Sequence, residues 1–273
     1  QVRGAELTVL DISLDSNRKP LLQLLESCRV FYVDHHYAGD LPASANLIAH
    51  LDPSPEVCTS LIVDGLLAGR FRAWGVVAAF GDNLHDSARK GAASLHLSES
   101  QVERLRELGE LMNYNGYGCK VADLYLPPQE LYAAIKPYAD PLAFCEESEH
   151  LALLRQGFAD DLHRANAVRP LRETPHGRIF VFPAEKWANR IAGVFSNEKA
   201  RERVDAAHAL LVDNGDGTFM VSVRAPLARR AGADSLCRAF PTGGGRAAAA
   251  GINALPAGQI EDFCQKFFEV FFL

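Results

Sequence analysis

The feature that most constrains the fold is a set of three short apolar runs, each of which leads into an acidic residue. The runs cover residues 7–10, 29–33 and 76–80, and they lead into Asp11, Asp34-His35-His36 and Asp82. Apolar runs without polar alternation are typical of parallel strands covered on both faces. The carboxyl ends of such strands share one edge of the sheet, where ligands bind. We therefore expect these acids and histidines to converge on one site.

The residue types at this edge favour a divalent metal ion, with Asp11, His35 and Asp82 as the ligands. Carboxylate oxygen and imidazole nitrogen together suit Mn²⁺ and similar ions. Two such ions about 3.5–4 Å apart hold the attacking and leaving oxygens in phosphoryl transfer. The structural alternative is that each aspartate only caps the next helix. For Asp11 alone the cap is favoured, whereas the grouping with Asp34-His35-His36 favours a metal site.

Composition limits the class of protein. The 273 residues are enough for two domains. A net charge of −6 argues against a protein that coats long nucleic acid, but allows a small anionic substrate bound by local arginines. The six cysteines are scattered without a C-x-x-C pair, and no signal peptide or membrane-spanning run is evident. We expect a cytoplasmic protein with reduced thiols and no membrane partner; a homodimer is left open.

The N-terminal pattern predicts a strand–helix–strand unit, with a helix at 19–27 between parallel strands. We then expect a loop at 38–55, a helix at 56–68 with Ser54 as its N-cap, and a strand at 71–80. A capping box starting at Ser98 opens a largely helical region that continues to about residue 168. A Pro/Gly-bearing segment at 169–177 predicts a linker, and thus domains at 1–168 and 178–273.

The C-terminal part reads as strands and helices in alternation. We expect strands at 178–182, 208–212 and 218–223, the last two joined by an Asn/Gly-rich hairpin, and helices at 186–200, 234–239 and 258–271. The fold class is therefore α/β: an N-terminal, mainly parallel sheet flanked by helices, plus a smaller C-terminal α/β domain across a cleft.

A glycine run in this second part, Gly243-Gly244-Gly245-Arg246, indicates an anion site. Successive glycines let backbone N–H groups approach a phosphate, although a lone run is more often a tight turn. Between residues 223 and 246 the sequence contains five arginines and only one acidic residue, Asp234. The arginines are Arg224, Arg229, Arg230, Arg238 and Arg246. Arg224, at the end of a strand, is the favoured substrate residue; Arg229 and Arg230 fit a solvated face. Tyr114 and Tyr117 could stack on a base, but such residues more often pack.

These motifs resemble those of the DHH phosphoesterases. Val33-Asp34-His35-His36 resembles the family signature, Leu10-Asp11-Ile12 its second acidic motif and Gly81-Asp82-Asn83 its fourth. The glycine run with Ala249-Ala250-Gly251 resembles the Gly-Gly-Gly-His…Ala-Ala-Gly element of the DHH-associated C-terminal domain. The motifs occur in the family's order across nearly the whole chain.

The resemblance implies residue roles. Asp11 would bridge two Mn²⁺ ions, and His35 and Asp82 would ligate one of them. His36 would lie near the substrate phosphate, and Asp34 would orient the histidines. Gly243, Gly244, Gly245, Arg246 and Arg224 would bind the substrate. The implied activity is hydrolysis of a short oligonucleotide, a cyclic dinucleotide or a 3′,5′-bisphosphorylated nucleoside.

Two departures from the family leave alternatives open. The first motif, Asp-x-Asp, has no counterpart among the ten residues before Asp11. Either it lies upstream of Gln1 or this member has lost it; two ions need it, and without it one ion or none would bind. Arg246 replaces the usual His, and arginine binds phosphate but does not readily donate a proton. The alternatives are a nucleotide sensor without catalysis and a pyrophosphatase-like enzyme, of which the glycine run disfavours the second.

Overall fold

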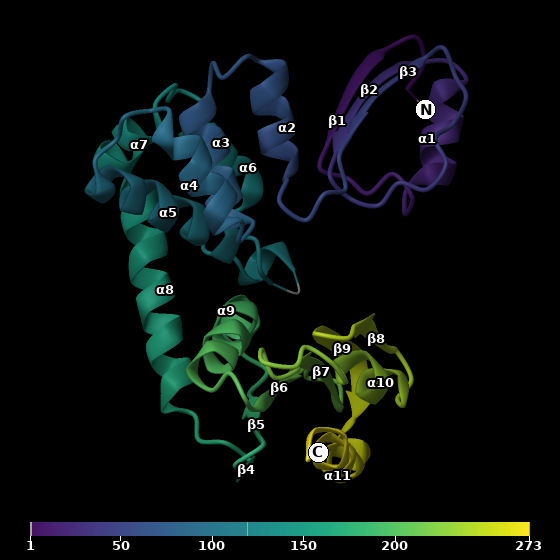
Figure 1. The fold of residues 1–273 in the computed structure, drawn as a ribbon, viewed down its shortest axis with the longest axis vertical. Helices are drawn as coiled ribbons and strands as arrows, with labels where there is room; N and C mark the ends of the chain where they lie inside the picture. The colour runs from purple at the N-terminus through teal and green to yellow at the C-terminus, as the bar shows by residue number, and fades with distance from the viewer. Residues whose placement is uncertain (1, 119, 273) are drawn as a thin grey trace. The chain divides into compact units, whose positions relative to one another are not determined.

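The computed structural model describes residues 2–118 and 120–272 (Figure 1). Contacts divide the chain into two compact units. Unit 1 comprises Gln1–Asn113 and Tyr132–Leu151, and unit 2 comprises Tyr114–Leu131 and Ala152–Leu273. The linker expected at 169–177 therefore lies within unit 2. The catalytic and substrate-binding assignments of domains 1–168 and 178–273 stay predictions.

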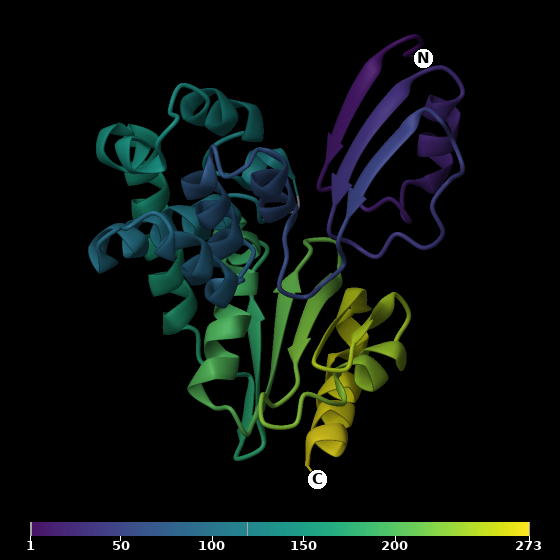
Figure 2. The same ribbon diagram turned by 45° about the horizontal axis from the view of Figure 1, so that its top comes forward.

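Unit 1 begins with a three-stranded parallel sheet in the order β1-β2-β3. Strands β1 (Glu6–Leu10) and β2 (Arg29–Asp34) are connected by helix α1 (Arg18–Leu25), which covers one face of the sheet (Figure 2). Leucines of α1 pack against Val30 and Tyr32. The predicted strand–helix–strand unit is thus confirmed, and Leu10 pairs with Val33. The residues that follow the two strands emerge side by side.

The prediction of a loop at 38–55 is wrong in part, because this segment contains strand β3 (Leu47–Leu51), which runs parallel to β2. This edge strand is only partly buried, and Ile48 is exposed. Its sequence therefore lacks the continuous apolar run of a central strand, and the prolines on either side of it favour a loop prediction. Helix α2 (Thr59–Leu66) follows with Cys58, not Ser54, at its N-cap.

The prediction of a strand at 71–80 is also wrong, because these residues form helix α3 (Arg72–Gly81). Helices α2, α4 (His85–Ala93) and α7 (Pro141–Glu147) all contact α3. Val76, Val77 and Phe80 are consequently buried together. An apolar run buried on several sides looks the same whether it is helix or strand, which is the known ambiguity of short apolar segments.

The rest of the helical region follows the predicted pattern. Helix α5 (Glu99–Tyr114) begins at the predicted capping box, in which Ser98 and Gln101 exchange hydrogen bonds. Helices α6 (Pro128–Ile135) and α8 (Glu149–Ala167) come later. Five cysteines are free thiols, as expected, and Cys119 lies outside the described residues. Within residues 2–118 and 120–272, no helix has the length and apolar composition needed to cross a bilayer.

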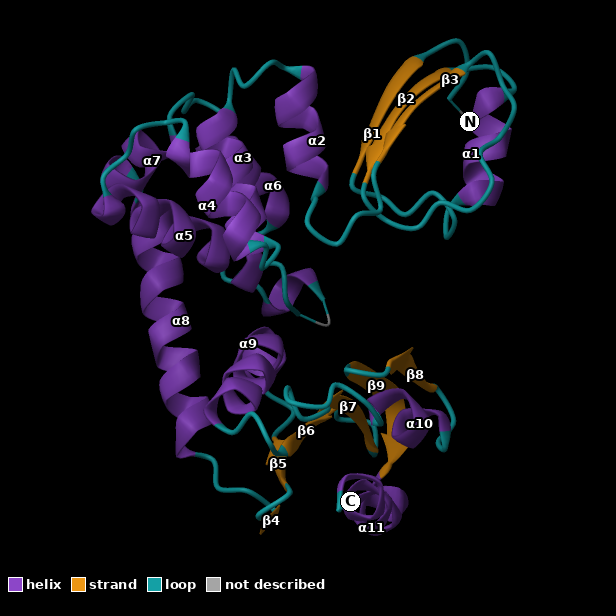
Figure 3. Ribbon diagram, in the orientation of Figure 1, coloured by secondary structure: helices purple, strands orange, loops and turns teal. Residues whose placement is uncertain are grey.

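Unit 2 is built on a six-stranded mixed sheet in the order β4-β5-β6-β7-β9-β8, coloured orange in the lower part of Figure 3. The strands are β4 (Arg172–Thr174), β5 (Gly177–Phe182), β6 (Ala207–Asp213), β7 (Thr218–Arg224), β8 (Gly243–Arg246) and β9 (Ala249–Pro256). Helix α9 (Lys186–Glu202) packs on one face. Helices α10 (Ala233–Arg238) and α11 (Ile260–Phe271) pack on the other. Together with the sheet of unit 1 and the flanking helices, this confirms the predicted α/β class.

A buried ion pair joins three segments of unit 2. Arg190 of α9 donates from Nε and Nη2 to the two carboxylate oxygens of Asp161 in α8, at 2.7 and 3.0 Å. The same guanidinium donates to the Asp123 carbonyl at 2.6 Å, and the Tyr114 hydroxyl donates to Asp161. Every member has a partner, so the segment around Tyr114 and Asp123 is held against helices α8 and α9.

Candidate metal centre

The end of β1 places Asp11 beside the end of β2. The Asp11 amide donates to the Val33 carbonyl at 3.0 Å, which continues the parallel ladder by one residue. Asp11 then adopts a left-handed backbone conformation, with φ of +60°. For a residue other than glycine this conformation is strained, and such strain concentrates at functional sites. The chain turns sharply here and leaves the carboxylate exposed at the sheet edge.

Hydrogen bonds define which nitrogen each histidine presents. Nδ1 of His35 lies 2.9 Å from the Val57 carbonyl, which can only accept, so Nδ1 carries the proton. Nδ1 of His36 lies 2.7 Å from a carboxylate oxygen of Asp34 and donates to it. When these rings are neutral, Nε2 carries the lone pair, which is the form that binds a metal ion.

Asp34, at the end of the central strand β2, is the fully buried member of the motif. One oxygen accepts from His36, and the other, Oδ2, has no hydrogen-bond partner among the residues that the structure describes. A buried carboxylate with one orphan oxygen is costly, so a neighbouring cation would stabilise it. This geometry agrees with the expected role of Asp34 in orienting a histidine, and limits that role to His36.

Asp82 reaches the same place from the end of helix α3 rather than from a strand. Its carboxylate lies 3.9 Å from Nε2 of His35, and Nε2 lies 3.6 Å from Oδ1 of Asp11. Partial burial raises the pKa of Asp82; the two histidines oppose this rise, and the negative charge of Asp11 adds to it. The expected convergence on His35 is therefore present, although one of the three supporting elements is a helix.

Two positioning groups were not anticipated from the sequence. The Thr59 hydroxyl, at the start of α2, donates to Oδ1 of Asp11 at 2.7 Å. Gly109 of α5 contacts the end of α3 so closely that an added Cβ would lie 2.2 Å from the Val77 carbonyl oxygen and 2.8 Å from the Gly81 nitrogen. A Thr and a helical Gly carry no local signal of such roles, because both depend on contacts distant in sequence.

The donor set fits a divalent cation. Asp11, His35 and His36 each offer a ligand atom, and these atoms all lie within 4.8 Å of one another. This set differs from the predicted one, since His36 joins it and Asp82 lies beside it next to His35. Two imidazoles whose Nδ1 atoms are held by hydrogen bonds, together with two carboxylates, match the ligands preferred by Mn²⁺ and related metals. The arrangement can hold one ion through the residues described.

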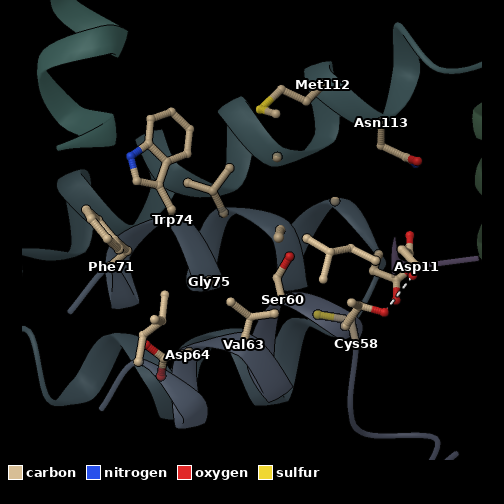
Figure 4. Close-up of a pocket in the computed structure, with 18 residues that line it drawn as sticks. Asp11, Cys58, Ser60, Val63, Asp64, Phe71, Trp74, Gly75, Met112 and Asn113 are labelled. Carbon is tan, nitrogen blue, oxygen red and sulfur yellow. Dashed lines mark hydrogen bonds between the residues drawn. The ribbon is translucent and has the colours of Figure 1, made fainter. Parts of the chain in front are cut away.

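A cavity of about 500 Å³ opens beside these residues within unit 1 (Figure 4). Asp11 and Cys58 lie at one end, and Phe71 and Trp74 lie at the opposite end. Its walls come from β1 and from helices α2, α3 and α5. The cavity is thus lined by apolar side chains with an acid towards each end, Asp11 beside the metal-binding residues and Asp64 on the side of Phe71.

The glycine run lies in unit 2 and is a strand, β8, rather than a turn. A Cβ at Gly243 would lie 1.8 Å from the Cys237 carbonyl oxygen, and one at Gly245 would lie 2.5 Å from Ala250. These two glycines are therefore required by packing. At Gly244 an added Cβ would meet no atom within 4 Å. Packing explains two of the three glycines and leaves Gly244 facing open space.

Strand register aligns the arginines of the predicted anion site. Arg224 and Arg246 both pair with Ala249, from opposite sides, so all three residues point to one face of the sheet. Gly244, two residues from Arg246, points to that face as well. By contrast, Arg238 pairs with Asp234 at 3.6 Å. The structure thus brings Arg224, Arg246 and Gly244 onto one surface of unit 2.

Comparison with known proteins identifies the fold. No protein-family model and no curated protein matches the sequence. Among solved structures, the DHH domain of a protein described as a member of a ribosomal-protein family matches with a TM-score of 0.64 and 13% identity, over 96% of this chain and 68% of that one. The exonuclease RecJ bound to manganese matches with a TM-score of 0.58 and 14% identity, over 96% and 74%.

A third structure extends this likeness over nearly the full length of both chains. The pGpG-specific phosphodiesterase PggH from Vibrio cholerae matches with a TM-score of 0.55 and 10% identity, over 97% of this chain and 99% of that one. Similarity at such low sequence identity shows the fold but not the activity, which has to be argued from the residues of the site. The protein described here has the fold of the DHH-domain proteins.

Proposed function

We propose that this chain is a metal-dependent phosphoesterase that hydrolyses phosphodiester or phosphomonoester bonds of short nucleotides. The observation that carries the proposal is the position of His35 Nε2, which lies 3.6 Å from Asp11 and 3.9 Å from Asp82 with its tautomer set by the Val57 carbonyl. RecJ bound to manganese and the phosphodiesterase PggH share the fold, which supports this class of chemistry.

The charge of the site explains why a metal would be needed. Asp11 and Asp34 at strand ends and Asp82 at the end of α3 make this site negative, so an anionic phosphate would be repelled there unless a cation neutralised them. Asp11, His35 and His36, with Asp82 beside them, would hold that cation. Mn²⁺ in this position would act as a Lewis acid on phosphoryl oxygens and increase the acidity of water. Mn²⁺ itself is part of the proposal, and a related divalent ion would serve the same chemistry.

The protein's own groups have distinct tasks in the proposed reaction. Thr59 holds the Asp11 carboxylate in place through a 2.7 Å hydrogen bond. Asp34 keeps the His36 proton on Nδ1, which directs Nε2 outward. In unit 2, Arg224 and Arg246 bind a phosphate or carboxylate group of the substrate, and Gly244 on the same face leaves space for it.

The test is hydrolysis of bis(p-nitrophenyl) phosphate and of a ribodinucleotide with and without Mn²⁺. We expect Mn²⁺-dependent turnover that falls by more than about 100-fold in His35→Ala, because a ligand is lost. His163→Ala, at an exposed position of α8, is the matched control and retains activity. Equal turnover in His35→Ala and the wild type would refute the proposal.

A second candidate is a protein that binds a nucleotide without cleaving it. The observation in its favour is that the ligand cluster found among the described residues, Asp11, His35 and His36, is a set for one ion, whereas the proposed phosphoryl chemistry is commonly carried out by two. The same assay separates the candidates. Nucleotide binding without Mn²⁺-dependent turnover would support the sensor, and turnover would support the enzyme. Release of phosphate from pyrophosphate would instead indicate a pyrophosphatase.

A further inference from the structure

Three segments of unit 2 meet around the guanidinium of Arg224. Its Nε donates to Oδ1 of Asn197 in α9 at 2.9 Å, and its Nη1 donates to the Ser222 hydroxyl at 3.1 Å. Tyr117, from the segment after α5, lies near enough to raise the pKa of Arg224, although burial outweighs this and lowers that pKa. The neighbourhood thus combines a cation, an amide and an aromatic ring.

Arg224 is a partly buried cation without a carboxylate partner among residues 2–118 and 120–272. Its hydrogen bonds go to neutral oxygens of Asn197, Ser222 and Val223. Removing a cation from water without an opposing charge is costly, and an anion bound beside it offsets that cost. Arg246, on the same face about 10 Å away by strand spacing, adds to the positive field.

Tyr117 presents an aromatic surface next to this cation. Its side chain is 42% exposed, whereas Tyr114, three residues earlier, is completely buried. The hydroxyl end of the Tyr117 ring lies over α9 at Gly193, where an added Cβ would be 3.7 Å from the ring. Gly193 and Asn197 are one helical turn apart and share a face of α9. The Tyr117 ring, at Gly193, and the Arg224 guanidinium, hydrogen-bonded to Asn197, therefore lie along the same face of α9.

The chemistry of this surface matches a nucleotide. A phosphate pairs with a guanidinium, and a base stacks on an exposed aromatic ring. The alternative, that Tyr117 only packs on α9, accounts for the ring edge at Gly193 but leaves the exposed ring beside an uncompensated cation unexplained. We propose that Tyr117 stacks on the base of a nucleotide whose phosphate is bound by Arg224. This inference rests on the proposed nucleotide phosphoesterase and specifies which part of the substrate unit 2 recognises.

The test is calorimetric titration of the full chain in EDTA, so that no metal contributes. The probes are adenosine 5′-monophosphate and ribose 5-phosphate, which lacks the base. The wild type is expected to bind the nucleotide at least about fivefold more tightly, because one stacked base contributes about 1–3 kcal/mol. Tyr117→Ala abolishes this preference, whereas Tyr117→Phe, which keeps the ring, preserves it. Arg224→Gln weakens binding of both probes.

Matched controls make the outcome decisive. Tyr132→Ala removes another exposed tyrosine, on α6, and is expected to keep the preference. Circular dichroism and thermal melting confirm that each variant is folded. A wild type without preference, a preference retained in Tyr117→Ala, or one lost in Tyr117→Phe would overturn the inference. Mn²⁺-dependent hydrolysis of bis(p-nitrophenyl) phosphate by the wild type reports on the proposed function separately.

Discussion

Replacing Gly109 by alanine tests whether the contact between α5 and α3 positions the metal centre. The added Cβ would lie 2.2 Å from the Val77 carbonyl oxygen. Ordinary contact between these atom types requires about 1 Å more, so the helices must separate or distort. Overpacking of this kind costs about 1–3 kcal/mol, while the better helix propensity of alanine returns about 1 kcal/mol. Because two backbone atoms and Phe80 are all contacted, we expect the upper part of that range, a net loss of about 2 kcal/mol.

Gly65→Ala is the matched control, because an alanine Cβ in α2 would meet nothing within 4 Å. It is expected to stabilise the protein by about 0.4–1 kcal/mol. The measurement is urea unfolding followed by circular dichroism. The free energies of unfolding are compared with the same m-value, the slope of free energy against urea concentration, for all variants. Gly109→Ala should also weaken Mn²⁺ binding, since Asp82 follows directly after the displaced residue Gly81. A Gly109→Ala protein as stable as the wild type would refute the reasoning.

Three further perturbations follow from the structure. Asp161→Asn leaves Arg190 buried without its charge partner and should lower the free energy of unfolding by about 3–5 kcal/mol in urea titration; a loss under about 1 kcal/mol would contradict this. Burial, then the charge of Arg178, lowers the pKa of His208 from 6.5 to about 4. Between those values the unfolded chain binds a proton that the folded chain does not. Stability should therefore fall by roughly 1.4 kcal/mol per pH unit as the pH drops from 6.5 to 4, and the fall should be shallower in His208→Gln. Identical slopes for the two proteins would exclude His208 as the cause. Asp34→Asn removes the charge that holds the proton on Nδ1 of His36 and should weaken Mn²⁺ binding about 10- to 100-fold by calorimetry; unchanged affinity would show that the tautomer is set otherwise.

Local pattern was sufficient for much of the fold. The strands ending at Leu10 and Asp34 and the helix between them carry dense apolar signals, and their parallel pairing follows from the connection. The capping box at Ser98 likewise marks a helix start through neighbouring residues alone. Where a residue's partners lie within a few positions of it in the chain, the sequence already contains the interaction.

Two errors show where local pattern is insufficient. The run at 76–80 has the composition of a buried strand, yet it forms part of helix α3, which is packed against α2, α4 and α7. Strand β3 is half exposed at a sheet edge, so the pairing that defines it lies in β2 and not in its own residues. Asp82 nevertheless reaches His35, because the end of α3 lies where a strand end was expected.

The amino-acid sequence by itself determines which residue types are present and in which order, and it shows that acids and histidines follow apolar segments. The distances that give them meaning were decided by packing: the carbonyl of Val57 that sets the His35 tautomer, the hydroxyl of Thr59 on Asp11, and the contact of Gly109 with α3. The first two pairs are separated by 22 and 48 residues in the chain, and Gly109 lies on a different helix from its partners. Interactions over such separations arise only when the chain is folded, since no short-range propensity encodes them.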